Sequence, residues 1–279
     1  MLYNNRTNKE IKGQMKMEFK YEIYTCNNGN PTAIIRNRDN EKTHENIAEK
    51  IYEIHPDVDQ VAVILDTEKE KCTFQLVNGE FCGNACLSVS AYMYENYKIQ
   101  NTTIINKIIN EDSKEEFIEI KSNYDGKTGN LLIPKKLFLT NNNEENKYNN
   151  LVKMNGISHL IIPQSFGTKN EEYAKKEIEK IEKNGTVPDV LGIIFLENNQ
   201  IDPFIWIKRI SLLQHQASCL SGSIAAAEYL QKIAKTDTNR IIQPTGEYYD
   251  IKFEKDYIDI TGTIRKQKSG TLEAEENVS

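Results

Sequence analysis

The sequence predicts an α+β fold of two pseudo-symmetric, β-rich units, each built around one helix. A cysteine followed by small residues and a helix-forming run occurs in Phe81–Tyr92 and again in Ser218–Tyr229, at one offset of 137 residues. In both places the order is strand, turn, strand, cysteine and helix, beginning at Pro56-Asp57-Val58 and at Pro188-Asp189-Val190. With 279 residues and 38% apolar content, the chain is long enough for two cores of roughly 100–150 residues each.

The first half of the chain predicts strands arranged around one helix. Alternating apolar residues in Phe19–Tyr24 indicate a half-buried strand, and the loop Asn27–Pro31 leads into a second strand. Isoleucines at helical spacing predict a helix over His44–Ile54. Later strands are expected at Val61–Leu65, Thr73–Val77, around Ile104, and at Phe117–Ile120 and Leu131–Ile133, with the cysteine helix running from Cys82 to about Tyr97.

The second half repeats this plan. Strands are expected at His159–Pro163, Gly192–Leu196, Phe204–Ile207 and within Ile241–Gly262, with an amphipathic helix over Glu171–Lys183 and a polar loop over Thr140–Asn146. The predicted organisation is a disordered extension over 1–16, a first unit over 17–127, a second over 128–264, and a polar, frayed tail over 265–279.

Composition limits the classes of partner and compartment. The net charge of −6 is spread over interspersed acids and bases, so nothing favours nucleic acid or an anionic membrane, and a small molecule is the expected ligand. No apolar run is long enough to span a membrane. The five cysteines form no dense, even-numbered framework and no signal peptide is evident, which predicts reduced thiols in a cytoplasmic protein.

Two matched cysteines at helix starts suggest a particular chemistry. The positive end of a helix dipole and its unpaired N–H groups favour thiolate, so the sequence predicts thiol pKa values lowered from about 8.5 towards neutrality. The same N–H groups can hold a carboxylate. If Cys82 and Cys219 face one cleft, one thiolate can remove the α-proton of an amino acid while the other thiol protonates the opposite face. Such a reaction inverts the stereocentre and requires no pyridoxal phosphate or other cofactor.

The motifs around both cysteines resemble those of the diaminopimelate epimerase family of cofactor-independent, two-cysteine racemases. The family has Cys-Gly-Asn-Gly-x-Arg at the first site, where this chain has Cys82-Gly83-Asn84-Ala85-Cys86-Leu87. It has Cys-Gly-Ser-Gly at the second site, where this chain has Cys219-Leu220-Ser221-Gly222. The sequence Gly79–Ala85 is similar to that of the histidine racemases of the staphylopine pathway. The resemblance implies two pseudo-symmetric domains, each a β-barrel-like sheet wrapped around a central helix.

The resemblance also implies roles for individual residues. Cys82 and Cys219 correspond to the acid–base pair, His159 to a histidine that assists one cysteine, and Gln216 to a glutamate beside the other. Asp59 corresponds to an acid that could meet an imidazole. The remaining substrate-binding candidates are Asn30, Gly83, Asn84, His215, Ser221 and Gly222. Members of that family are often homodimers, so a homodimer is one alternative to a monomer.

Several departures from the family pattern leave alternatives open. The family's Glu-Arg pair before the second cysteine, whose arginine binds a distal carboxylate, is absent, and this chain has His215-Gln216-Ala217-Ser218 there. We therefore expect a histidine racemase, with diaminopimelate epimerisation as the alternative. Gln216 and Leu220 keep a non-catalytic amino-acid-binding or redox-sensing protein open. A zinc module of Cys82, Cys86, Cys219 and His215 is disfavoured, because only the first pair is closely spaced, and no metal site is predicted.

Overall fold

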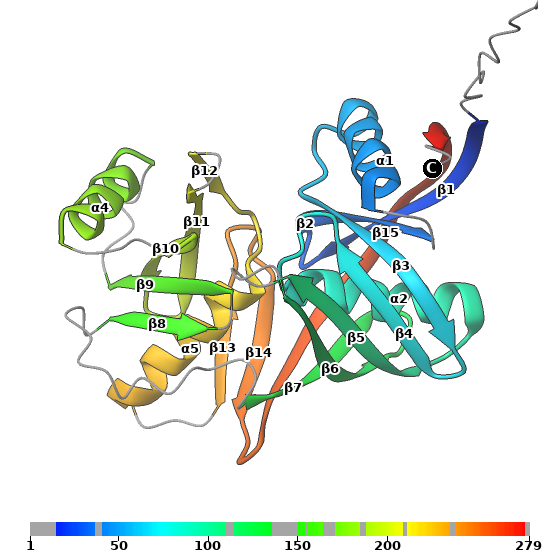
Figure 1. Ribbon diagram of the computed structural model, residues 1–279. Coiled ribbons are helices and arrows are strands. Elements are labelled where there is room, and N and C mark those ends of the chain that lie inside the picture. The colour runs from blue at the N-terminus through cyan, green and yellow to red at the C-terminus, as the bar shows by residue number, and fades with distance from the viewer. Residues whose placement is uncertain are drawn as a thin grey trace, which may run out of the picture.

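A computed structural model of the chain describes residues 15–36, 41–109, 114–135, 150–154, 156–163, 171–184, 188–208, 211–234 and 238–276 (Figure 1). The strands are β1 (Met15–Cys26), β2 (Gly29–Arg36), β3 (Gln60–Glu68), β4 (Lys71–Leu76), β5 (Asn101–Ile109), β6 (Glu115–Tyr124), β7 (Thr128–Pro134), β8 (Leu151–Met154), β9 (Ile157–Pro163), β10 (Val190–Glu197), β11 (Gln200–Ile207), β12 (Leu212–His215), β13 (Thr238–Ile242), β14 (Tyr248–Phe253) and β15 (Tyr257–Glu276). The helices are α1 (Glu41–Ile54), α2 (Gly83–Tyr97), α4 (Glu171–Asn184) and α5 (Leu220–Ala234).

Eight of these strands close into a barrel around α2. Hydrogen-bonded neighbours follow the order β1-β2-β3-β4-β5-β6-β7-β15, and β15 pairs with β1 to close the ring. All α2 residues from Gly83 to Met93 are buried, and none of them is charged. A helix that is apolar or small on every side is stable only when it is surrounded, and the barrel provides this environment.

Helix α1 covers the outside of the barrel. Phe19, Tyr21 and Ile23 of β1 pack with Ile47 and Ile51 of α1 in a separate apolar cluster. Successive side chains of a strand point to opposite faces. Tyr24 and Cys26 of β1, which are fully buried, belong instead to the core around α2.

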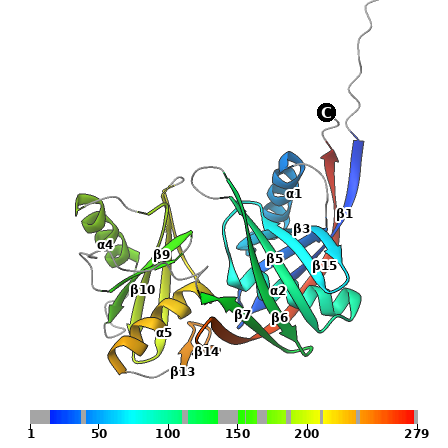
Figure 2. The same cartoon turned by 60° about the horizontal axis from the view of Figure 1, so that its bottom comes forward.

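The remaining strands continue the sheet beyond the barrel. From β15 the order is β14, β13, β11, β10, β9 and β8, with β12 added to β11. Ile161 and Ile194 share a core with Ile224 of α5, whereas their neighbours Leu160 and Ile193 face α4. This sheet therefore has α5 on one face and α4 on the other, and α4 lies at the end of the molecule away from the barrel in both views (Figures 1 and 2).

The C-terminal tail corrects the sequence prediction. Residues 265–279 were expected to fray, but β15 continues to Glu276 and pairs with β1 from Met15 onward. The prediction is wrong because backbone hydrogen bonds to β1 do not depend on the polar side chains, and because Leu272 is buried beside Phe19 beneath α1. Of the expected N-terminal extension, residues 1–14 lie outside the described residues, as does the expected loop at 140–146.

The strand pairing also bears on the expected division of the chain. The sequence places a boundary at residue 128, but β7 pairs with β6 and with the returning strand β15 inside the barrel. The barrel thus combines strands from both ends of the chain, which local sequence patterns could not indicate.

No helix within the described residues has the length and apolar content needed to span a membrane.

Candidate active site

Both matched cysteines lie at helix starts, as the sequence predicts. Cys82 is the N-cap residue of α2 and has extended backbone dihedrals (φ −141°, ψ 117°). Cys219 directly precedes Leu220, the first residue of α5. Each sulfur therefore lies close to the N–H groups that a helix leaves unpaired in its first turn.

The two helix starts pack against each other. A Cβ atom built on Gly83 would lie 2.5 Å from Leu220 Cδ2, so a side chain at residue 83 would require Leu220 of α5 to move. Asn84 Nδ2 donates a hydrogen bond to the carbonyl oxygen of Ser218, at 3.2 Å. Residues following Cys82 thus contact residues on both sides of Cys219, which brings the starts of α2 and α5 together.

Cys82 is partly buried at the start of α2. Burial raises the pKa of the Cys82 thiol to about 12, although hydrogen bonds from the backbone of Ala85 and Asn84 and from the Gln60 side chain act in the opposite direction. The sequence predicted a pKa lowered towards neutrality, and this prediction is wrong. Desolvation of a buried anion outweighs what the helix start and one amide provide.

Cys219 is buried, with 4% of its surface exposed. The backbone N–H of Gly222 donates to its sulfur at 3.3 Å, and Ser221 Oγ lies 3.6 Å from the same atom. Burial raises the pKa of this thiol as well, and the hydrogen bonds from Ser221 and Gly222 offset the rise only in part. Both thiols are therefore protonated near pH 7.

His159 lies on β9, on the face of the sheet that α5 covers. It is fully buried, and neither ring nitrogen has a hydrogen-bond partner among the described residues. It pairs with Gly192 across β9 and β10, and any side chain at residue 192 would overlap its ring. Ile194, on the same face two residues on, lies against the first turn of α5 at Gly222. Burial lowers the pKa of His159 to about 3, so its imidazole is neutral.

Asp59, directly before β3 of the barrel, bonds to a strand that lies beyond the barrel. Its Oδ1 accepts a hydrogen bond of 2.7 Å from Gln214 Nε2 on β12. Burial raises the pKa of this carboxyl to about 6, and the bond from Gln214 opposes the rise. Asn30 also lies at this junction, where its Oδ1 accepts from the backbone N–H of Ser218 at 3.4 Å.

The structure does not bring every predicted residue to the two sulfurs. His215 Nε2 lies 2.7 Å from Asp202 Oδ1, and its ring lies 4.8 Å from that of Phe204, on the face of the sheet that α4 covers. Gln216 makes a backbone bond to Pro203, and no described hydrogen bond joins its side chain to Cys219. Asn84 is 2% exposed and uses both of its amide atoms within the protein.

Comparison with known proteins identifies the family. The domain described as "Histidine racemase CntK N-terminal domain" matches residues 20–272. The chain belongs to this family. The resemblance to the diaminopimelate epimerase-like racemases, seen in the two cysteine motifs, is thereby confirmed.

Individual relatives agree with this histidine racemase family assignment. Two proteins named histidine racemase, from two strains of Fusobacterium nucleatum subsp. nucleatum, are 28% and 29% identical to the chain over 245 and 243 residues. Each match covers 83% of this chain and 88% or 89% of the relative. The protein is therefore an isomerase of the racemase and epimerase class, and its relatives place it among the amino-acid racemases.

Solved structures share the fold of this family member. A hydroxyproline epimerase from Agrobacterium vitis, with bound trans-4-hydroxy-L-proline, matches with a TM-score of 0.62 and 10% identity over 95% of both chains. A phenazine biosynthesis protein of the PhzF family from Enterococcus faecalis matches with a TM-score of 0.58 and 15% identity, over 92% of this chain and 99% of that chain. At these identities the likeness concerns the fold alone.

Three residues of this histidine racemase family member were missed by sequence reasoning. Gln60, at the first position of β3, bonds to Cys82 through its side chain. Gln243 accepts from the Cys219 N–H at 2.9 Å and donates to Ser223 Oγ at 2.8 Å. Tyr249 donates to Asn84 Oδ1 at 2.7 Å. Of the three, only Gln60 had a signal in the sequence, because it begins a buried strand and follows Asp59.

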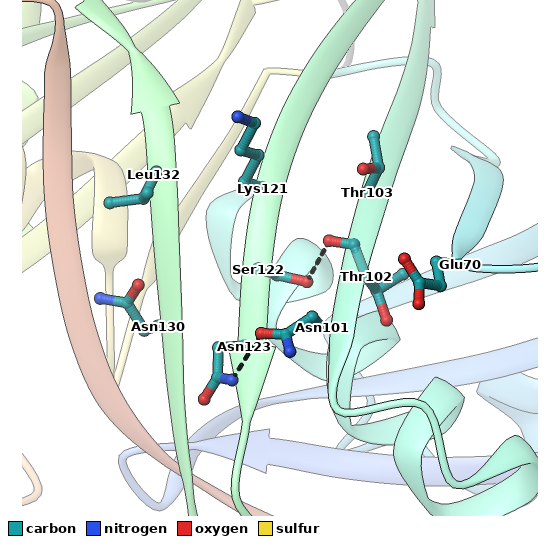
Figure 3. Close-up of a pocket in the computed structure, with 9 residues that line it drawn as sticks. All are labelled: Glu70, Asn101, Thr102, Thr103, Lys121, Ser122, Asn123, Asn130 and Leu132. Carbon is teal, nitrogen blue, oxygen red and sulfur yellow. Dashed lines mark hydrogen bonds between the residues drawn. The ribbon is translucent and has the colours of Figure 1, made fainter.

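A cavity of about 260 Å³ lies elsewhere, over the strands β5, β6 and β7 of the barrel. Most of its lining residues are of polar types, including Asn101, Lys121, Asn123 and Asn130, and no cysteine is among the residues drawn (Figure 3). Within the described part of the chain, no three His, Cys, Asp or Glu side chains gather where they could hold a metal ion. The zinc alternative therefore lacks a ligand set among these residues.

Proposed function

We propose that the protein is a cofactor-independent histidine racemase that inverts the α-carbon with two thiols, Cys82 and Cys219. The observation that carries this proposal is the direct packing of the two helix starts at Gly83 and Leu220, each with a cysteine immediately before it. Family membership and the relatives named histidine racemase support the choice of substrate.

The proton transfers balance without an added reagent. The thiolate of one cysteine takes the α-proton and becomes a thiol, while the electron pair stays on carbon. The thiol of the other cysteine then protonates the opposite face and becomes a thiolate. The first-turn N–H groups of α2 and α5 hold the α-carboxylate and stabilise the negative charge that develops on it. The enzyme ends the turnover with its proton on the other sulfur.

The raised thiol pKa values suit a very weakly acidic α-carbon. A thiolate formed from Cys82 is a stronger base than a free cysteine thiolate, because burial raises its pKa to about 12. Brønsted behaviour makes proton abstraction faster with a stronger base, whereas the thiolate is rare at neutral pH. The α-ammonium group of a bound amino acid would favour the thiolate through its positive charge.

We assign recognition of the imidazole to Asp59, and a supporting role to His159, which lies on the face of the sheet that α5 covers. The pKa of Asp59, raised to about 6, lies close to that of a free imidazole at about 6.5, so a shared proton can join the two groups. Gln214 already donates to one oxygen of Asp59 and leaves the other for a ligand. His159, held neutral by burial, can accept or donate a hydrogen bond but adds no positive charge. His215 has a weaker claim, since it bonds to Asp202 on the face of the sheet that α4 covers, and Gln216 keeps only its place in the family motif.

We further propose that the two halves are pseudo-symmetric copies. In the first half β2–β3 are parallel, β3–β4 antiparallel and β4–β5 parallel. In the second half β9–β10, β10–β11 and β11–β13 repeat this sequence of directions. Our division keeps a first unit over 17–127 and a second over 128–264, and β7 and β15 of the second unit complete the barrel of the first. The five free thiols favour a cytoplasmic location.

Deuterium exchange tests the function directly. L-Histidine in heavy water should acquire deuterium at its α-carbon and yield D-histidine, followed by proton NMR and chiral chromatography. Cys82→Ser and Cys219→Ser should each lower racemisation about 10²–10⁴-fold. Cys72→Ala, which alters a buried thiol of β4, serves as the matched control. Exchange of diaminopimelate but not histidine would favour the alternative substrate, and full activity in either serine variant would refute the mechanism.

A further inference from the structure

A closed ring of hydrogen bonds joins the two cysteine-bearing helix starts. Tyr249 Oη donates to Asn84 Oδ1 at 2.7 Å, and Ser218 Oγ lies 3.1 Å from the same hydroxyl. Asn84 Nδ2 donates to the Ser218 carbonyl oxygen at 3.2 Å. Because a hydroxyl has a single proton, the Tyr249 hydroxyl that donates to Asn84 must accept from Ser218.

The hydrogen-bonded ring is buried from solvent and held by close packing. Tyr249 and Ser218 are 0% exposed and Asn84 is 2% exposed, so water does not compete for these bonds. The aromatic side chain of Tyr249 lies against Gly262 of β15, where an added Cβ atom would come within 2.6 Å of Tyr249 Cε1. Burial raises the pKa of Tyr249 well above its usual range, so the hydroxyl keeps its proton. Buried, fully satisfied networks of this kind specify one geometry.

The positions of the three residues give the ring its significance. Asn84 lies two residues after Cys82, and Ser218 directly precedes Cys219. Tyr249 comes from β14, next to β15 in the sheet that links the barrel to the second half. The Tyr249 hydroxyl thus bonds to one residue near each of the two cysteines.

We infer that Tyr249 is a positioning residue that sets the spacing of Cys82 and Cys219 through Asn84 and Ser218. The inference rests on the two-thiol mechanism proposed above. Inversion needs both sulfurs aligned with one α-carbon, whereas exchange with retention needs only one. A misplacement of about 1 Å can cost about 10²-fold in rate. Loss of the Tyr249 hydroxyl should therefore harm inversion more than exchange.

The test compares Tyr249→Phe with Tyr248→Phe, the same chemical change at the neighbouring, 40% exposed residue. With L-histidine in heavy water, Tyr249→Phe should lower kcat for racemisation about 10–100-fold with KM within about twofold. The ratio of deuterium exchange with retention to inversion should rise at least about threefold, and Tyr248→Phe should change neither quantity. An unchanged ratio in a folded Tyr249→Phe protein would overturn the inference.

A second measurement does not depend on turnover. Diamide oxidises two nearby thiols to a disulfide and is itself reduced to the hydrazine, so the rate of Cys82–Cys219 cross-linking, read by peptide mass spectrometry, reports their spacing. That rate should differ at least about threefold between Tyr249→Phe and wild type. Equal rates would overturn the inference even if wild type racemises histidine. A changed rate in a protein that racemises nothing would support the inference and refute the proposed function instead. Ser218→Ala, which keeps the Tyr249–Asn84 bond, should give a smaller change of the same sign and replaces Tyr249→Phe if that variant fails to fold.

Discussion

The contact between Gly83 and Leu220 can be tested by a double-mutant cycle. An alanine Cβ at residue 83 would lie 2.5 Å from Leu220 Cδ2 and 3.1 Å from Cδ1 and Cγ. Favourable contacts between carbon atoms are about 3.5–4.0 Å long, so Leu220 would have to move by about 1 Å. It is 2% exposed and belongs to the main core, which leaves it little room.

The magnitude follows from two opposing effects. Overpacking of a buried site costs about 1–3 kcal/mol, while replacing glycine by alanine in a helix contributes about 1 kcal/mol of stability. Gly83→Ala should therefore destabilise the wild-type protein by about 0–2 kcal/mol. Leu220→Ala alone should cost about 2–5 kcal/mol through the cavity it leaves. In that background the clash is gone, and Gly83→Ala should stabilise by up to about 1 kcal/mol.

Urea denaturation of the four proteins measures the cycle, with the midpoint and the slope fitted separately. The coupling free energy between the two sites should be about 1–3 kcal/mol. Gly270→Ala provides the control, because its added methyl group meets Tyr21 and not Leu220, so its cost should be the same in both backgrounds. If Gly83→Ala changes the free energy of unfolding equally with and without the Leu220 side chain, the starts of α2 and α5 are not in contact at these residues.

Three further predictions concern ionisable groups. Asp59→Asn should raise KM for histidine about tenfold, which kinetics measures. It should also increase stability at pH 7–8 by about 1–3 kcal/mol, because a folded pKa raised to about 6 means that ionised Asp59 destabilises the fold above that pH. Calorimetry measures this gain. His159, with its pKa lowered to about 3, must stay neutral in the folded state, so stability should fall by about 1.4 kcal/mol per pH unit on acidification below pH 6.5, and an urea-denaturation series should show a shallower fall in His159→Gln. Iodoacetamide should alkylate Cys82 before the four buried cysteines, at a rate that still rises above pH 9, and a plateau near pH 8.5 would contradict the raised pKa.

The contact at Gly83 also gives a physical reason for one departure from the epimerase motif. In the family's second motif, Cys-Gly-Ser-Gly, the first glycine corresponds to Leu220 of this chain. The Leu220 side chain fills the space next to Gly83. The larger residue is tolerated because the opposite position has no side chain. From sequence, Leu220 suggested an impaired second site, whereas in the fold it is part of the contact between the two helices.

The sequence by itself determined the two cysteine helices, the strands around them and the family. These follow from local patterns, since a helix without charges over Gly83–Met93 must be enclosed and a motif recurs at a fixed offset. Glycine, asparagine and cysteine at the helix starts were sufficient to indicate a racemase, which the family match then confirmed.

Only the tertiary structure decided how these parts work together. The closure of the barrel by β15, the bridge through Tyr249 and the bond between Asp59 and Gln214 join residues more than a hundred positions apart, and no local pattern encodes such pairs. The thiol pKa values were mispredicted for the same reason. The helix start is a local feature that lowers a pKa, but burial depends on everything packed around the sulfur, and here desolvation is the larger effect.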